Sequence, residues 1–258
     1  MGEALLGGWL DAGVPVADLA VAEVDPDRRR HLEERCPGVR VVPSAAWASA
    51  DADVLVVAVK PGDVPAALAA CEPTLGADAL VLSIAAGVTI KELEAGVPGR
   101  PVVRAMPNTA ALVRLGAAAI AAGTTATEEH LDLAEQLLGA VGVVVRVPER
   151  LLDAVTGLSG SGPAYVFLVA EALVEAGVLN GLPRDIAEVL VSQTLLGAST
   201  LLAEDPGAAE ELRAAVTSPG GTTAAGLLAL EQRAVRAALV EAVSAATARS
   251  HELGAGHA

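Results

Sequence analysis

The chain has 258 residues, of which 53% are hydrophobic and 19% charged, so it is long and apolar enough to bury a sizeable core. Such a composition excludes disorder as the main state. The 17 basic and 32 acidic side chains give a net charge of -15, which repels polyanions and excludes nucleic acid as a partner. Aromatic residues make up only 2% of the chain, so base stacking on aromatic side chains is excluded as well.

The cysteines and the most apolar stretch predict a soluble chain in a reducing compartment. Cys36 and Cys71 follow no secretory leader in this sequence, so we expect free thiols and a cytoplasmic location. The four histidines lie outside any metal-ligand spacing, and no metal site is expected. Residues 163–179 are the most apolar stretch, but Glu171 and Glu175 interrupt it. This stretch therefore predicts a buried helix rather than a membrane span.

In chain order, the first half alternates helical stretches with short β-rich runs. Helices are expected at residues 2–12, 26–35, 65–70, 90–94 and 128–140, and strands at 19–24, 39–42, 54–59, 79–84, 101–105, 117–122 and 143–147. Several strands are apolar on both faces, which is typical of a parallel sheet covered by helices on both sides. Residues 1–150 are therefore expected to form a doubly wound, Rossmann-like α/β domain that binds a dinucleotide.

After about Arg150 the strand-like runs stop and a period of 3.6 residues dominates. Helices are expected at residues 162–177, 184–203, 208–216, 223–230 and 233–253, with Pro183, Pro206 and Pro219 near helix starts or in turns. Residues 151–258 are thus expected to form an all-α domain. Because its helices are apolar and rich in alanine, we expect one face to pack against a second copy of the chain.

The beginning of the chain departs from the usual pattern of a nucleotide-binding domain, in which a strand and a glycine-rich turn precede the first helix. Met1-Gly2-Glu3-Ala4 already has the character of that helix, so the first strand and its glycines are absent. Either the true start of translation lies upstream of Met1, or the domain binds no dinucleotide. We expect the former, because a parallel sheet without its central strand exposes two unpaired strand edges.

Three motifs follow predicted strands, where an open α/β sheet binds its ligands. Lys60, in Val-Lys-Pro, is placed to meet a phosphate or a ribose. The small residues 83–87 admit a flat ring, and Asn108, in residues 104–109, can donate and accept hydrogen bonds at once. Each motif also has a structural explanation: a solvated lysine, tight strand–helix packing, and a polar turn.

Two glycine-rich motifs lie in the second half. Residues 159–165, SGSGPAY, open a long helix and suit an anion, a hinge or simple N-capping. Residues 216–223, VTSPGGTT, precede another apolar helix. Their glycines let backbone N–H groups converge, and their four hydroxyls add donors, so they favour a small carboxylate over a plain turn. No activated nucleophile is evident, which leaves hydride transfer by a cofactor as the chemistry that fits both halves.

Together these motifs closely resemble the pyrroline-5-carboxylate reductase family, in its order and across essentially the whole chain. The matching segments are Met1-Gly-Glu-Ala, AVKP at 58–61, AAGVT at 85–89, RAMPNT at 104–109, SGSGPAY at 159–165 and VTSPGGTTAAGL at 216–227. The resemblance implies NAD(P)H-dependent reduction of 1-pyrroline-5-carboxylate to L-proline, the last step of proline biosynthesis. It also implies an interlocked homodimer of helical domains, often assembled further into a decamer.

The resemblance also implies roles for individual residues. The cofactor-binding set is Met1, Gly2, Ala58, Val59, Lys60, Pro61, Ala85, Ala86 and Asn108. The substrate-binding set is Ser218, Gly221, Thr222 and Thr223. The family places a hydroxyl at Thr223 that can hydrogen-bond the ring nitrogen, and our hypothesis is that Thr223 is the catalytic proton donor.

Three features bear on the cofactor. The glycine-rich turn is missing, and Ala45 stands where many relatives have an asparagine near the adenosine ribose. Glu23 and Asp25 favour the free 2′-hydroxyl of NADH, whereas the arginines at 28–30 are suited to the 2′-phosphate of NADPH. The residues themselves leave this choice open, and the family resemblance favours NADP(H).

Two other interpretations compete with this one. A reductase for a different imine or a 3-hydroxy acid is the first, but the hydroxy-acid branch uses a catalytic lysine in the helical domain, and residues 151–258 contain none. The second is a non-catalytic relic that binds a dinucleotide or proline without turnover. The coding sequence upstream of Met1 distinguishes the relic from an enzyme.

Overall fold

The computed structural model describes residues 1–204 and 207–255, so Pro206 and the end of the predicted helical domain lie outside the described residues. The chain divides into two compact units. One comprises Met1–Ser161 together with the part of the chain from Ser244 onward, and the other comprises Gly162–Val243.

The first unit is built on seven short strands, each within a few residues of its predicted position. They are β1 (Ala20–Ala22), β2 (Arg40–Val42), β3 (Val54–Val57), β4 (Leu80–Ser83), β5 (Val102–Met106), β6 (Gly116–Ala122) and β7 (Gly142–Arg146). Among the described residues, β1 pairs only with β2, and the other strands form a second sheet in the order β3-β4-β5-β6-β7. The two sheets confirm the prediction of a Rossmann-like domain that lacks its first strand.

The direction of β6 corrects the prediction of a purely parallel sheet. Strand β6 runs antiparallel to β5, while the β3–β4, β4–β5 and β6–β7 pairs are parallel. A parallel crossover needs a dozen or more residues, and only residues 107–115 connect these two strands. The chain between them is therefore too short to return to the start of the sheet.

A pair of glycines lets β6 and β7 begin side by side. Gly116 and Gly142 are partners in the ladder, and Gly142 has a φ of 154°. A Cβ atom on Gly142 would lie 2.0 Å from the carbonyl oxygen of Gly116. Any side chain at position 142 would therefore push the two strands apart.

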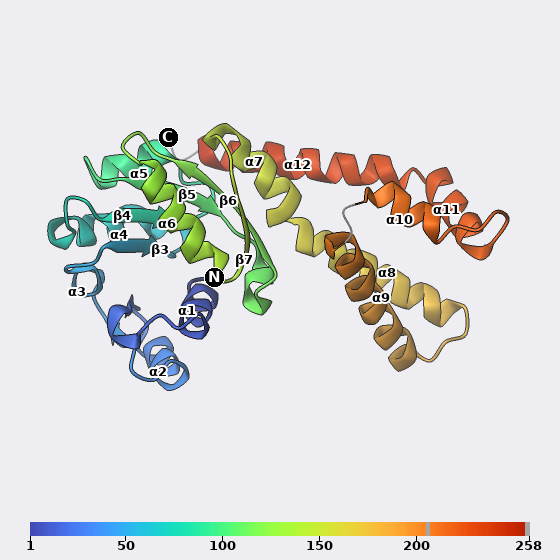
Figure 1. Ribbon diagram of the computed structural model, residues 1–258, viewed down its shortest axis with the longest axis horizontal. Coiled ribbons are helices and arrows are strands. Elements are labelled where there is room, and N and C mark those ends of the chain that lie inside the picture. The colour runs from blue at the N-terminus through green and yellow to red at the C-terminus, as the bar shows by residue number, and fades with distance from the viewer. Residues whose placement is uncertain (205–206, 256–258) are drawn as a thin grey trace. The chain divides into compact units, whose positions relative to one another are not determined.

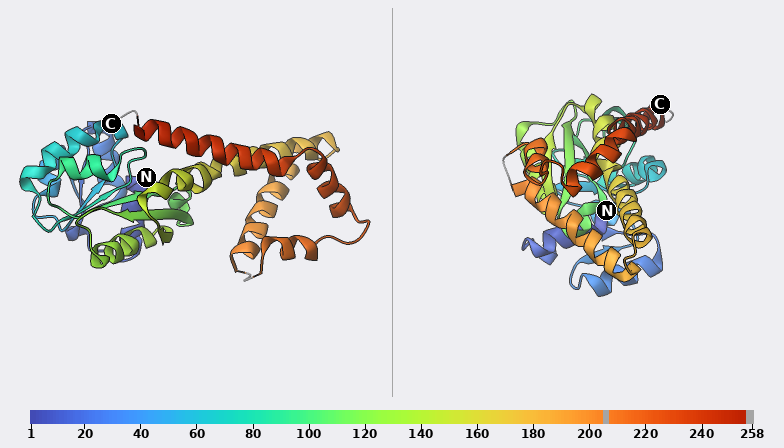
Figure 2. Two further views of the ribbon diagram at one scale, coloured as in Figure 1. Left: turned by 90° about the horizontal axis from the view of Figure 1, so that it is seen from above. Right: turned by 90° about the vertical axis from the view of Figure 1, so that its right-hand side faces the viewer.

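Helices cover both faces of the larger sheet (Figures 1 and 2). The helices within residues 1–161 are α1 (Gly2–Asp11), α2 (Pro26–Arg35), α3 (Ala45–Ser49), α4 (Val64–Cys71), α5 (Ile90–Gly96), α6 (Glu128–Gly139) and α7 (Leu152–Val155), with 3-10 turns η1 (Val16–Asp18), η2 (Pro61–Asp63), η3 (Glu72–Thr74), η4 (Thr109–Val113) and η5 (Glu149–Leu151) and a π-helix, η6 (Thr156–Gly160). Of these, α2 and α3 pack against the smaller β1–β2 sheet. One core contains Leu82 of β4 with Leu5 of α1 and Leu138 of α6. The neighbouring Val81 points to the opposite core, with Leu68 of α4. Alternate residues of β4 thus serve opposite layers.

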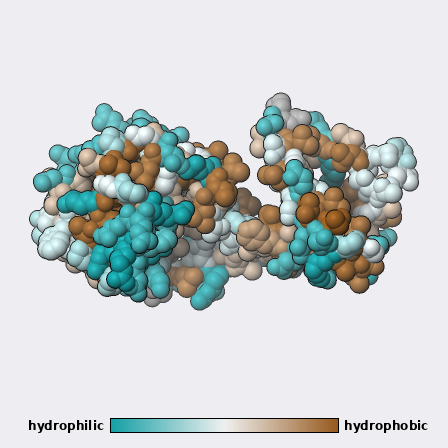
Figure 3. Space-filling model, turned by 90° about the horizontal axis from the view of Figure 1, so that it is seen from below, coloured by the Kyte–Doolittle hydropathy of each residue, from teal (hydrophilic) through white to brown (hydrophobic). Residues whose placement is uncertain are grey.

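The second unit is helical, as predicted, but its apolar side chains are largely uncovered. It contains α8 (Gly162–Leu179), α9 (Arg184–Glu204), α10 (Ala209–Ala215), α11 (Thr222–Gln232) and the first part of α12 (Val235–Ala255). Phe167, Leu168 and Val189 are 63%, 65% and 67% exposed. Figure 3 shows hydrophobic side chains gathered on this unit's surface. The prediction that residues 163–179 are buried is therefore wrong for the single chain.

Two helical segments of the described chain, Glu149–Leu179 and Arg184–Glu204, are long and apolar enough to cross a membrane by length and composition alone. Core helices of soluble proteins meet the same criterion.

Candidate active site

The carboxyl ends of β3, β4 and β5 lie together, because these strands are neighbours and run in the same direction. Three turns of the predicted cofactor set therefore meet at one edge of the sheet. Residues 58–61 follow β3, Ala85 and Ala86 follow β4, and Asn108 follows β5. This edge is where open α/β sheets bind ligands.

The N-terminus of α1 lies against the end of β3. A Cβ atom on Gly2 would lie only 3.1 Å from Cβ of Ala58, so the two backbones approach closely. The carbonyl of Met1 accepts hydrogen bonds from the amides of Ala4 and Leu5, whereas the amides at the start of a helix have no intrahelical acceptor. Small residues beside free helix amides suit the pyrophosphate of a dinucleotide.

The turn after β4 presents a small, partly accessible surface. Ala85 is buried, and its amide lies 3.3 Å from Oγ of Ser83, to which it donates. Ala86 is exposed, and Gly87 turns the chain with a φ of 77°. Across the edge, Val59 and Lys60 are exposed as well. A flat ring has backbone and small side chains to lie against here, so the residues fit a nicotinamide.

Asn108 has both ends of its amide group bonded within the protein. Nδ2 donates to the carbonyl of Ser159 (3.0 Å), and Oδ1 accepts from the amide of Ala117 (3.1 Å). Nearby, a Cβ atom on Gly160 would lie 2.7 Å from Cε of Met106. Asn108 and Gly160 thus join the end of β5 to the π-helix η6. A contact of Asn108 with the cofactor stays a prediction.

The acidic side chains that follow β1 accept hydrogen bonds from backbone amides at the beginning of α2. Oδ1 of Asp25 accepts from the amides of Asp27 (2.8 Å) and Arg28 (3.1 Å), and Oε1 of Glu23 accepts from the amide of Asp25 (3.0 Å). The hydrogen bonds from the amides of Arg28 and Asp27 hold the pKa of Asp25 below its ordinary value.

The arginines that follow have different partners. Nη1 of Arg29 donates to the carbonyls of Glu23 and Val24, both at 2.8 Å, which holds its positive charge at the end of β1. Arg28 is paired with Glu3 of α1, and Arg30 with the exposed Asp27.

The predicted substrate set lies in the helical unit, where the loop that follows α10 enters α11. Gly220 has a φ of 68°, and the amide of Gly221 donates to the carbonyl of Ser218 (3.0 Å). A Cβ atom on Gly221 would lie 2.2 Å from Oγ of Ser218, so any larger residue here would require this hydroxyl to turn away. Ser218 and Gly221 thus lie in the loop, and Thr222 and Thr223 form the beginning of α11.

The loop offers donors without a basic side chain. Gly221 is the N-cap of α11, and no acidic residue lies in the first turn of this helix. Ser218, Thr222 and Thr223 are exposed in the single chain. Hydroxyls beside the positive end of an 11-residue helix suit a small carboxylate.

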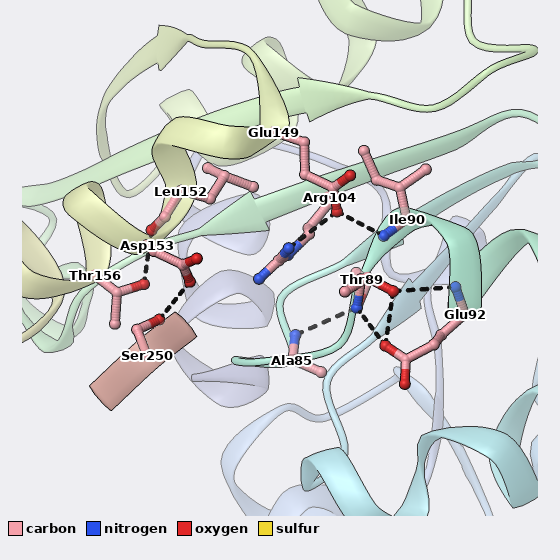
Figure 4. Close-up of polar contacts among 11 residues, drawn as sticks. Ala85, Thr89, Ile90, Glu92, Arg104, Glu149, Leu152, Asp153, Thr156 and Ser250 are labelled. Atoms are coloured by element: carbon pink, nitrogen blue, oxygen red, sulfur yellow. Dashed lines mark hydrogen bonds and ion pairs between the residues drawn. The ribbon is translucent and has the colours of Figure 1, made fainter. Parts of the chain in front are cut away.

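Sequence reasoning missed a group of polar side chains beside the turn after β4 (Figure 4). Oε1 of Glu149 accepts from Nη1 of Arg104 (3.0 Å) and from the amide of Ile90 (2.7 Å). Oδ1 of Asp153 accepts from Oγ of Ser250 (2.7 Å). These partners lie 45 to 97 residues apart in the chain, so no local motif could reveal them. In the described part of the chain, no group of three or more metal-ligating side chains is found.

Two family models match the chain. Residues 149–253 match "Pyrroline-5-carboxylate reductase dimerisation", and residues 1–87 match "NADP oxidoreductase coenzyme F420-dependent". The pyrroline-5-carboxylate reductase of Mycobacterium tuberculosis (strain ATCC 25618 / H37Rv) is 47% identical over 277 residues, covering 98% of this chain and 93% of the relative. The enzyme of Pisum sativum is 41% identical, covering 98% and 92%.

Solved structures agree. A pyrroline-5-carboxylate reductase from Coxiella burnetii superposes with a TM-score of 0.93 at 36% identity, covering 98% of this chain and 94% of the other. Pyrroline carboxylate reductase from Plasmodium falciparum, solved with NADP bound, gives 0.85 at 30% identity, covering 98% and 94%. With its sheet edge, its helical loop and these relatives taken together, the chain belongs to the pyrroline-5-carboxylate reductase family.

Proposed function

We propose that this chain reduces 1-pyrroline-5-carboxylate to L-proline with a hydride from NAD(P)H, which is the last step of proline biosynthesis. The observation that carries the proposal is the similarity along 98% of the chain to reductases of this name. The geometry supports it, because one chain combines a dinucleotide-type sheet edge with a carboxylate-binding helix N-terminus. In this proposal residues 1–150 hold the dinucleotide, and residues 151–258 bind the substrate and form the dimer.

The residues of the α10–α11 loop perform the substrate chemistry. Ser218, Gly221 and Thr222 hold the carboxylate through hydroxyl and backbone donors. When bound, the reduced nicotinamide supplies the hydride to the imine carbon. Thr223 donates a hydrogen bond to the ring nitrogen, which becomes more negative as the C=N double bond is reduced, and a proton ends on that nitrogen to give the secondary amine.

We further propose NADP(H) as the preferred cofactor. Oε1 of Glu23 and Oδ1 of Asp25 already accept hydrogen bonds from local amides, which leaves one oxygen of each carboxylate for a ribose hydroxyl. The guanidinium of Arg29 is held at the end of β1, and its positive charge there favours binding of the negatively charged 2′-phosphate of NADP(H). The relative from Plasmodium falciparum is described with NADP bound.

A homodimer is the proposed assembly, and the family resemblance implies that five such dimers assemble further into a decamer. The match to a dimerisation model over residues 149–253 covers most of the exposed apolar helices. In this proposal a second copy covers α8 and α9, so that neither helix spans a membrane. Glu171 and Glu175 within α8 favour this arrangement over a bilayer. The proposed location is the cytoplasm.

The test is oxidation of NADPH and of NADH by the purified chain in the presence of 1-pyrroline-5-carboxylate, followed by the loss of nicotinamide absorbance. We expect turnover with both, and a kcat/KM at least about tenfold higher with NADPH, a difference of about 1.4 kcal/mol. A higher kcat/KM with NADH would overturn the choice of cofactor alone. Absence of turnover, both here and in a version extended upstream of Met1, would overturn the reaction.

A further inference from the structure

The turn formed by residues 85–87, after β4, packs against the last turn of α12. A Cβ atom built on Gly87 would lie 3.9 Å from Cβ of Leu253, and one built on Gly254 would lie 3.5 Å from the carbonyl oxygen of Gly87. These are ordinary van der Waals distances. Both segments belong to the first unit, so the end of α12 forms one wall of the turn that carries Ala85 and Ala86.

Ser250 holds this end of α12 in place. Its side chain is 7% exposed, although most of α12 around it is exposed or half-buried. Its Oγ donates to Oδ1 of Asp153 at 2.7 Å (Figure 4). Residues three and four positions apart share a helix face, so Ser250 lies on the same face as Leu253 and Gly254.

Asp153 in turn belongs to a segment that is anchored to the sheet. Four residues earlier, Glu149 accepts from Arg104 of β5 and from the amide of Ile90, the first residue of α5. Arg104 is buried, whereas the side chain of Glu149 is 35% exposed, so this ion pair is shielded from water on the arginine side. Residues 149–153 therefore hold the 85–87 turn from both sides, at the start of α5 and at the end of α12.

We propose that Ser250 is a positioning residue, which acts through Asp153 to hold the end of α12 against the 85–87 turn and thereby shapes the nicotinamide site. The inference rests on the proposed function, which assigns Ala85 and Ala86 to the cofactor. Ser250 itself touches no substrate. Its loss affects the binding of the cofactor more than the binding of the imine.

The first experiment compares Ser250→Ala with Ser244→Ala, which removes an exposed serine hydroxyl from the same helix. We expect Ser250→Ala to raise the Kd of NADPH, read from the fluorescence of bound NADPH, by about three- to tenfold, which is the size of the net contribution of one ordinary hydrogen bond. The KM for NADPH rises in step, while kcat and the KM for 1-pyrroline-5-carboxylate stay close to wild type. Ser250→Thr, which keeps the hydroxyl, restores binding.

A double-mutant cycle tests whether Ser250 works through Asp153. In an Asp153→Ala background, Ser250→Ala has no further effect on the Kd of NADPH, because the hydrogen bond is already lost. Additive losses would overturn the proposed route. An equal change in every kinetic constant, with a lowered Tm, would show a merely structural role and overturn the proposal too.

Hydrogen exchange decides the proposal independently of the reaction. Without cofactor, amides in residues 84–93 should exchange faster in Ser250→Ala than in wild type or Ser244→Ala. Unchanged exchange there would overturn the proposal. Failure of the wild type to turn over would overturn the proposed function, whereas the exchange result would still show whether α12 holds the turn.

Discussion

Thr223 and Asn108 have polar side chains in contrasting surroundings. The hydroxyl of Thr223 lies exposed in the first turn of α11, beside amides that have no intrahelical acceptor. Asn108, by contrast, uses both polar atoms of its side-chain amide: Nδ2 donates to the carbonyl of Ser159, and Oδ1 accepts from the amide of Ala117. Thr223 is therefore available to a ligand in the way that a catalytic donor requires, and Asn108 stabilises the backbone around the sheet edge.

At the residue scale, replacing Thr223 tests the hypothesis that this residue is the catalytic proton donor. We expect Thr223→Ala to lower kcat by about 100-fold, because a positioned donor to the developing charge is lost. The Kd of NADPH should not change. Thr223→Ser keeps the hydroxyl and serves as the matched control, with a kcat within a few-fold of wild type. Full turnover by Thr223→Ala, in the same assay of NADPH oxidation, would end this hypothesis.

At the scale of elements, local side-chain to backbone bonds decide where several helices begin. Asp25 caps α2 with two hydrogen bonds to amides, and Pro26 occupies the first helical position, where no amide partner is needed. Thr89 and Glu92 form a reciprocal capping box at α5. Each helix is the next one after a strand, so these caps also fix the backbone of the connection that leads out of that strand.

The aspartate that caps α2 is expected to make the stability of the folded chain depend on pH. Because the pKa of Asp25 is lowered from its ordinary value of 3.8 by amide donors, its stabilisation is present above that value and is lost as the pH falls through the lower, folded pKa. We therefore expect Asp25→Ala to lower the thermal midpoint at neutral pH, and the gap to wild type to close in acid. Asp25→Asn retains an uncharged acceptor and should lose less. A gap that is constant down to strongly acidic pH would contradict this.

At the scale of the whole molecule, the helical unit exposes a large apolar surface, which we expect a second copy to cover. In α8 and α9, which lie entirely within the described residues, Ala187 is the only buried residue. Exposed leucines, valines and a phenylalanine line the outside of both helices. Large contiguous apolar surfaces on soluble proteins are usually interfaces.

Light scattering should therefore give a mass at least about twice the 25.7 kDa of one chain. Leu168→Glu, in α8, places a charge on the exposed apolar surface and should lower the mass toward that of a monomer. Val24→Glu is the matched control, because Val24 is 83% exposed in the other unit and should leave the mass unchanged. A monomeric wild type would refute the proposed dimer.

Much of the architecture follows from local sequence. The helix predicted at residues 26–35 forms with the same bounds, because a capping aspartate and a proline directly precede a run of polar helix formers. The β-rich runs likewise became strands, and the loop 216–223 became a turn into a helix. These features depend on neighbours in the chain, and periodicity and turn residues report them directly.

What the sequence determined by itself was the seven strands and the longer helices, but not the short helices α3 and α7, together with the motifs of the family. The tertiary structure alone decided the antiparallel direction of β6, the exposure of α8, and the links from Arg104 to Glu149 and from Asp153 to Ser250. The physical reason is distance along the chain. Strand pairing, burial and long-range hydrogen bonds depend on which surfaces meet after folding, and a single sequence carries no local signal for such meetings.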